Sequence, residues 1–122
     1  TGIVEIITYV YSKNPDKYSD RLYNKVLNKT IELSIKGEAK PIIPHPKDKN
    51  WNGLSLPWMA YGYGISLTPL QILTFYNSIA NKGKMMLPIF TTSIRLHGKD
   101  VIYKHPKVVK SQICSKNTIE KI

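Results

Sequence analysis

The chain has 122 residues, of which 42% are hydrophobic and 21% are charged, a composition typical of one small folded domain. No apolar run approaches the roughly 18 residues that a membrane-spanning helix requires. The single cysteine, Cys114, excludes an internal disulfide, and the three histidines lie far apart without the spacing of metal ligands. We therefore expect no metal site and no cofactor.

The net charge of +10 comes from 18 basic and 8 acidic residues. Such an excess is typical of proteins that bind nucleic acid or an anionic surface. Here the lysines are spread over every segment, whereas nucleic-acid readers usually gather basic residues on one element. We expect solvated lysines and no nucleic-acid partner. A basic, non-catalytic binding module for an acidic polymer is the alternative.

Residues 3–12 are rich in β-branched apolar side chains, which favour a strand, yet Ile3, Ile7 and Val10 also share one face of a helix. Periodicity alone leaves both assignments open. The run Asn14-Pro15-Asp16 is a clear helix start, with a capping residue, a proline at the first position and an acid in the first turn. It predicts a helix over about residues 15–27.

Residues 29–38 alternate loosely between apolar and polar side chains, as a short strand does. The following segment contains Pro41, Pro44, Pro46 and Pro57 and a cluster of turn-forming residues. Prolines at this density are incompatible with a helix or a central strand. We therefore predict a long surface loop over residues 39–57.

The strongest helix prediction spans residues 68–82. Thr68 is a good N-cap, Pro69 fits the first helical position, and Gln71 completes a capping box three residues after the cap. Gly83 supplies a residue that readily adopts the left-handed conformation at the helix end. Before this helix, Gly62 and Gly64 predict a segment whose backbone passes close to its neighbours.

Residues 89–103 alternate and are interrupted by His97-Gly98-Lys99-Asp100, a pattern that predicts a β-hairpin. Residues 104–112 are expected to be extended, because Pro106 interrupts regular pairing. Ser115 is then positioned to cap a last helix over residues 115–122.

A family resemblance rests on several of these runs together: Tyr61-Gly62-Tyr63-Gly64, Thr68-Pro69-Leu70-Gln71, and Ala80-Asn81 with Gly83. They resemble the transpeptidase domain of class B penicillin-binding proteins, in the cell-division version found in Bacteroidota. The resemblance implies an α+β fold, in which residues 1–122 are a mostly helical part of the penicillin-binding transpeptidase domain with one β-hairpin. It also implies that residues 3–12 are helical.

Enzymes of that family need three motifs: Ser-x-x-Lys with the nucleophile, Ser-x-Asn, and Lys-Thr-Gly or Lys-Ser-Gly. No serine here is followed three residues later by lysine, and neither form of the third motif occurs. Two Ser-x-Asn triplets begin at Ser12 and Ser115, but both stand at predicted helix starts. We therefore expect no catalytic residue, and we interpret the chain as the segment between the second and third motifs, inert by itself.

The resemblance also implies partners. The chain would pack against the remainder of the transpeptidase domain, and its uncovered apolar faces would promote self-association. Peptidoglycan stem peptides and β-lactams would bind only the parent enzyme, which the family anchors in the bacterial inner membrane with this domain in the periplasm. The chain itself shows no targeting or transmembrane segment.

Six residues are expected to lie beside the substrate groove or to serve the fold, namely Tyr61, Gly62, Tyr63, Gly64, Thr68 and Gln71. For the two tyrosines, a packing role is the favoured interpretation. An independent small enzyme is disfavoured, because the sequence shows no nucleophile–base pair, paired-carboxylate motif or phosphate loop.

Overall fold

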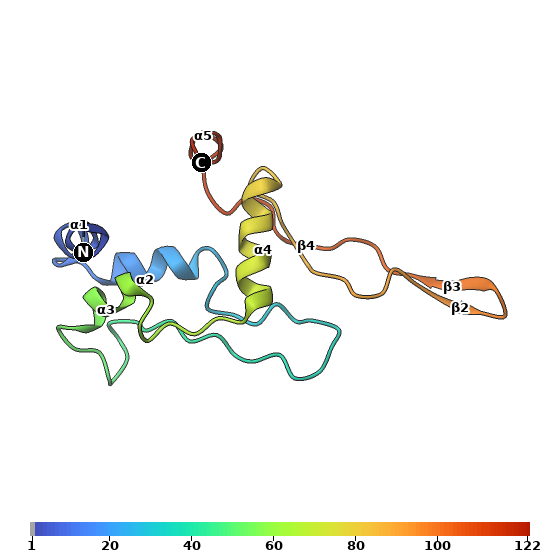
Figure 1. Cartoon of the computed structure of the whole chain (residues 1–122), viewed down its shortest axis with the longest axis horizontal. Coiled ribbons are helices and arrows are strands. Elements are labelled where there is room, and N and C mark those ends of the chain that lie inside the picture. The colour runs from blue at the N-terminus through green and yellow to red at the C-terminus, as the bar shows by residue number, and fades with distance from the viewer. Residues whose placement is uncertain (1) are drawn as a thin grey trace. The chain divides into compact units, whose positions relative to one another are not determined.

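The computed structural model describes residues 2–122 and is an α+β chain of five helices and four short strands among those residues (Figure 1). The chain divides into two units. Unit 1 comprises the chain up to Lys29 together with Ala39–Thr68, and unit 2 comprises Thr30–Glu38 and Pro69–Ile122. No helix in the described part of the chain is long and apolar enough to cross a membrane.

Unit 1 begins with helix α1 (Gly2–Tyr11), which decides the open assignment of residues 3–12 in favour of a helix. α1 packs against α3 (Ser55–Tyr61). The opposite face of α1 is uncovered, because Ile3, Ile6 and Tyr9 are each more than 60% exposed. Helical spacing gathers these side chains into one apolar surface.

Helix α2 (Asp16–Tyr23) starts where the sequence predicts but ends four residues early. Val26 has a left-handed φ of 62°, a conformation that cannot continue an α-helix. No side chain caps the N-terminus of α2, so the predicted capping role of Asn14 is wrong. The prediction of a helix to residue 27 therefore missed the turn that follows Tyr23.

Residues 29–38 form no strand, contrary to prediction. The Glu38 carboxylate instead accepts hydrogen bonds from the backbone amides of Ile31 (2.5 Å) and Leu33 (3.1 Å). These bonds close a loop in which Glu32 and Gly37 have positive φ angles of 59° and 95°. A side-chain acceptor thus replaces the neighbouring strand that an alternating segment would otherwise require.

Helix α3 begins at Ser55, inside the segment predicted as a loop over residues 39–57. Pro57 is its third residue, and the first four amides of a helix have no intrahelical acceptor, so a proline there costs no hydrogen bond. Leu56 and Met59 are buried and anchor α3 in unit 1. The loop is thereby shortened, and one bridge between Ile42 and Ser66 ties it to the chain after α3.

Gly62 ends α3 with a φ of 90°. A Cβ added at Gly62 would meet no atom within 4 Å, and one at Gly64 would lie 3.5 Å from the Pro44 side chain, an ordinary contact. The prediction of close backbone approach at these glycines is therefore wrong. What both positions require is the left-handed conformation, since Gly64 has a φ of 73°.

Unit 2 is built on helix α4 (Pro69–Ala80), which lies within the predicted range of 68–82. Gly83, with a φ of 87°, follows it as expected. Strand β1 (Met85–Met86) packs on α4 and pairs antiparallel with β4 (Val108–Lys110). β4 was not predicted, because its pairing partner lies more than 20 residues earlier in the chain.

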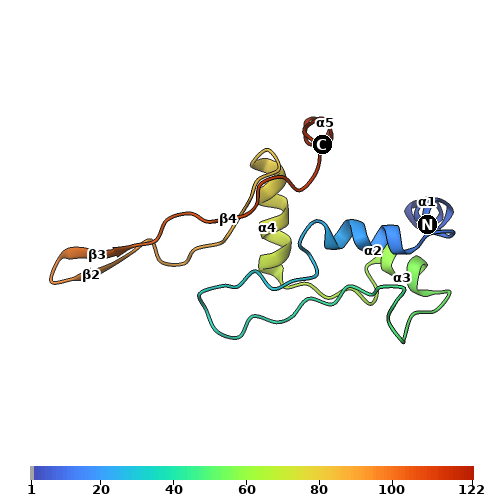
Figure 2. The same ribbon diagram turned by 180° about the vertical axis from the view of Figure 1, so that it is seen from behind.

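Strands β2 (Ser93–Leu96) and β3 (Lys99–Tyr103) form the predicted hairpin, in a shorter form. His97 and Gly98 have φ angles of 50° and 78°, as the centre of a type I′ turn requires. Within unit 2 the hairpin projects away from α4, as both views show (Figures 1 and 2). The last helix, α5 (Lys116–Glu120), is capped by Ser115, which accepts from the Thr118 amide.

The substitution Gly62→Ala tests whether the left-handed conformation matters there. We expect it to lower the free energy of unfolding by about 1 kcal/mol, because a Cβ disfavours the positive φ. Gly53→Ala is the matched control, since Gly53 has open space and no positive φ. Urea unfolding followed by circular dichroism measures both variants, and equal stabilities would contradict the argument.

Candidate functional site

The six residues singled out by the sequence lie between the end of α3 and the first turn of α4. Tyr61 and Tyr63 are 58% and 71% exposed, so neither is a core residue in this chain. Gly62 and Gly64 follow these two tyrosines, and both have positive φ angles. Thr68 directly precedes α4, and Gln71 is buried within its first turn.

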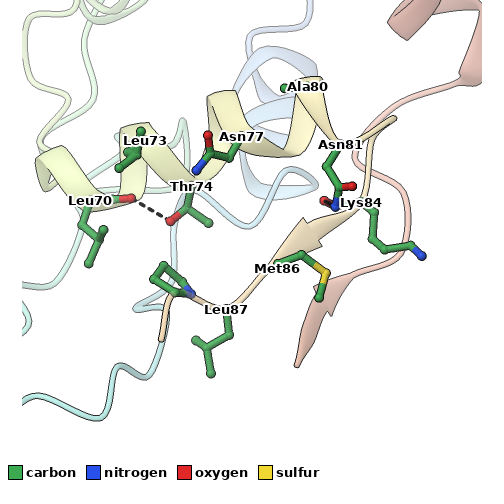
Figure 3. A pocket seen from close by; sticks show the side chains of 10 residues that line it. Leu70, Leu73, Thr74, Asn77, Ala80, Asn81, Lys84, Met86 and Leu87 are labelled. Atoms are coloured by element: carbon green, nitrogen blue, oxygen red, sulfur yellow. Dashed lines mark hydrogen bonds between the residues drawn. The ribbon is translucent and has the colours of Figure 1, made fainter. Parts of the chain in front are cut away.

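A groove lies along α4 and strand β1 in unit 2, with a volume of about 440 Å³ (Figure 3). Leucine, methionine, alanine and proline side chains supply its apolar surface. The lining residues are Leu70, Leu73, Thr74, Asn77, Ala80, Asn81, Lys84, Met86, Leu87 and Pro88. None of these is a histidine, cysteine, aspartate or glutamate.

Two polar side chains of the α4–β1 groove are already bonded to the backbone. The Thr74 hydroxyl donates to the Leu70 carbonyl at 2.7 Å, the contact dashed in Figure 3. The Asn81 amide donates to the Lys84 carbonyl at 3.0 Å. The groove therefore suits an apolar packing partner, and Lys84 is the one ionisable side chain among its lining residues.

A buried polar cluster in unit 1 joins α2 to the proline-rich loop. Ser19, which is fully buried, donates from Oγ to the Pro44 carbonyl at 2.8 Å. The Tyr23 hydroxyl donates to the Ile43 carbonyl at 3.1 Å. Two side chains of one helix thus satisfy consecutive carbonyls of a loop that has no strand partner at that point.

His45 completes this cluster and is 6% exposed. Its Nδ1 accepts from the Lys47 amide at 3.2 Å, so the proton of the neutral ring belongs on Nε2, which lies 3.3 Å from Asp20 Oδ1. The His45 amide in turn donates to Asp48 Oδ2 at 2.7 Å. Every polar atom of the ring is thereby engaged in holding the loop.

Two half-buried tyrosines of α2, Tyr23 of this cluster and Tyr18, have raised pKa values. Burial raises the pKa of Tyr23, and the carboxylates of Asp48 and Asp20 raise it further. Burial also raises the pKa of Tyr18, with a smaller contribution from Tyr11. A raised pKa favours a donor over a nucleophile, which agrees with the hydrogen bond from Tyr23 to Ile43.

Sequence reasoning missed this cluster, since its hydrogen-bonded partners on α2 and on the loop lie 20 to 25 residues apart in the chain. The one available signal was His45 between two prolines, Pro44 and Pro46, in a segment otherwise read as a solvated loop. Residues 2–122 contain no group of three or more His, Cys, Asp or Glu side chains able to hold a metal ion.

Comparison with known proteins identifies a family that this chain matches. The model of the penicillin-binding protein transpeptidase domain matches residues 13–122. The chain is 32% identical to penicillin-binding protein PbpB of Mycobacterium tuberculosis over 74 residues, 61% of this chain and 11% of that protein. It is 29% identical to peptidoglycan D,D-transpeptidase FtsI of Buchnera aphidicola over 101 residues, 82% of this chain and 16% of that protein.

Comparison with solved structures matches the same family. Penicillin-binding protein 3 of Mycobacterium tuberculosis, in its apo form, superposes with a TM-score of 0.69 at 26% identity, over 88% of this chain and 23% of that one. Its complexes with ampicillin and with aztreonam match equally well. The chain thus spans less than a quarter of the length of each of these relatives.

The raised pKa values predict how stability depends on pH. A tyrosine whose pKa is higher in the folded chain stabilises the fold below its unfolded value of about 10 and ceases to do so as the pH rises through the folded value. We expect the urea midpoint to fall from about pH 9 to about pH 11, and to fall less in Tyr23→Phe. Tyr9→Phe, at a position that is 88% exposed, is the control and should keep the full dependence.

Proposed function

Since the chain belongs to the family of penicillin-binding protein transpeptidase domains, we propose that it is a segment of a peptidoglycan D,D-transpeptidase that cross-links the cell wall. The family match over residues 13–122 is the observation that carries this proposal. The relative named FtsI supports a cell-division enzyme in particular. We place the segment between the Ser-x-Asn and Lys-Thr-Gly motifs, because the sequence contains neither Ser-x-x-Lys nor Lys-Thr-Gly.

In the parent enzyme, the serine of the Ser-x-x-Lys motif attacks the carbonyl carbon between the two D-alanines of a stem peptide. An ester forms, the terminal D-alanine leaves with a proton on its nitrogen, and an amine of a neighbouring strand then displaces the serine. A β-lactam reacts with the same serine by opening its ring. The ampicillin and aztreonam complexes of penicillin-binding protein 3 support β-lactam binding by the parent.

Under this proposal the chain supplies framework rather than reacting atoms. Ser19, Tyr23 and His45 fix the proline-rich loop on α2, and the Thr68–Gln71 start fixes the beginning of α4. Tyr61, the last residue of α3, and Tyr63, just after it, then either border the substrate groove of the parent enzyme or pack within its fold. We also propose that the parent is anchored in the inner membrane with this domain in the periplasm, as the family resemblance implies.

The rest of the transpeptidase domain is the natural partner of the uncovered apolar faces. On α1 these are Ile3, Ile6 and Tyr9, and on α4 they include Leu73 and Tyr76. An isolated chain leaves such faces in water, which favours association with other copies. The same surfaces therefore account for assembly in the parent and for self-association of the chain alone.

Intact-mass analysis after incubation with a fluorescent penicillin tests the placement between the motifs. We expect no covalent adduct on this chain, because the acylated serine lies outside it. Penicillin-binding protein 3 of Mycobacterium tuberculosis, treated in parallel, serves as the positive control. A stoichiometric adduct on the chain that maps to one of its own serines would overturn the placement.

Light scattering at rising protein concentration tests the uncovered faces. We expect oligomers of the wild-type chain and a shift toward monomer in Ile6→Lys, because a charge on the apolar face of α1 opposes its burial. Glu5→Lys adds more positive charge at an exposed site on the same helix, and it should leave the association unchanged. A wild-type chain that stays monomeric at high concentration would contradict this account.

A further inference from the structure

The hairpin β2–β3 has one face whose polar groups are satisfied within the hairpin. Arg95 Nε donates to Asp100 Oδ1 and the Tyr103 hydroxyl donates to Asp100 Oδ2, each at 2.5 Å. These two bonds, led by that from Tyr103, lower the pKa of Asp100. Arg95 pairs with Asp100 across the strands, so the three side chains share this face. The polar face needs no external partner.

The other face is mostly apolar and is uncovered, with Lys99 opposite Leu96 at the turn end. Ile94 and Ile102 are cross-strand partners, and Leu96 lies two residues from Ile94 on the same side. Their side chains are 47%, 50% and 61% exposed. No other helix or strand of unit 2 packs extensively on the hairpin. A two-stranded hairpin is only marginally stable alone, so this face is suited to a partner.

The two edges of the hairpin differ in their ability to receive another strand. The register passes from Ile94–Ile102 to Arg95–Asp100, which leaves Val101 as an extra residue in β3. Such a bulge bends the edge it occupies and hinders strand addition. Strand β2 (Ser93–Leu96) has no extra residue and presents its regular edge, with its backbone amides and carbonyls spaced for an added strand.

The charge around the hairpin identifies the chemistry of the partner. Residues 90–107, the hairpin and its flanking segments, contain four lysines and arginines and only one acid, Asp100, so they carry a net charge of +3. The single acid is already engaged by Arg95 and Tyr103. This segment therefore attracts an acidic partner and repels a basic one.

An acidic polypeptide fits these features better than a lipid surface or a nucleic acid. Insertion into lipid would leave the backbone groups of the open β2 edge without hydrogen bonds. The hairpin carries a single tyrosine, Tyr103, whereas proteins that bind single-stranded nucleic acid stack successive bases on several aromatic side chains. A polypeptide strand satisfies the edge, covers the apolar face and neutralises the charge at once.

We propose that the edge of β2 accepts an acidic strand of a partner protein, whose alternating apolar side chains continue the face formed by Ile94, Leu96 and Ile102. This inference does not depend on the proposed transpeptidase function. It assigns the projecting hairpin a recognition role that is separate from the apolar faces of α1 and α4.

The test titrates the full, nitrogen-15-labelled chain with acetyl-Val-Glu-Val-Glu-Val-Glu-Val-amide and follows the backbone amides by NMR. We expect saturable shifts centred on Ser93–Leu96 that weaken as salt is added. The matching Val–Lys peptide should produce none. Ile94→Asp should weaken binding about tenfold or more. Val101→Asp, which adds the same charge on the bulged strand, should change it less than about twofold.

Several results would overturn the proposal. These are the absence of shifts at millimolar Val–Glu peptide, an equal response to the Val–Lys peptide, or shifts confined to β3. A response of the hairpin to phosphatidylglycerol vesicles but not to the peptide would reject it in favour of a lipid surface. If Ile94→Asp lost its cross-strand contacts, the shift map of the wild-type chain and the Val–Lys comparison would still decide the question.

Discussion

The hydrogen bond from Ser19 to the Pro44 carbonyl is the contact on which the shape of unit 1 depends most. Few apolar side chains are buried in this unit, namely Leu27, Ile43, Leu56 and Met59. A small apolar core leaves little to fix a proline-rich loop, so buried polar groups of α2 define its position instead. Ser19 and Tyr23 of α2 donate to the loop carbonyls of Pro44 and Ile43. His45, which belongs to the loop, accepts from the Lys47 amide and pairs with Asp20 of α2.

The same shortage of buried apolar surface explains the character of the whole chain. Its composition is ordinary for a folded domain, yet large side chains on α1, α4 and the hairpin are exposed. Exposed surface of this kind is usual where a segment is completed by other parts of a protein. The small share of PbpB, FtsI and penicillin-binding protein 3 that this chain matches agrees with that interpretation. The α4–β1 groove is mainly apolar, and Lys84 is the single ionisable side chain among its lining residues, so it has the character of a packing surface rather than an active site.

The sequence predicted those elements whose signals are local. Thr68-Pro69 and Gly83 bracket α4, Ser115 caps α5, and His97-Gly98 forms the hairpin turn. Elements that depend on distant partners were missed. Glu38 closes the loop that alternation had suggested as a strand, and β4 exists through its pairing with β1. The start of α3 was missed for a different reason. Pro57 was taken as part of a loop, but a proline costs no hydrogen bond in the first turn of a helix.

For the site, the family and the absence of the first and third catalytic motifs could be read from the sequence, because both are local patterns. The His45 cluster could not, since no spacing rule connects Ser19, Asp20 and Tyr23 with a loop 20 to 25 residues away. The roles of Tyr61 and Tyr63 stay predictions, because they depend on what the rest of a transpeptidase domain places beside them.

A chimera tests the central claim most directly. Residues 13–122 would replace the matching segment of penicillin-binding protein 3 of Mycobacterium tuberculosis, and the rate of acylation by ampicillin would be measured by mass spectrometry. If this chain is the framework segment between the catalytic motifs, the folded chimera forms the acyl-enzyme at the serine of its host. A chimera that folds with native-like circular dichroism and thermal unfolding but is never acylated would contradict the account.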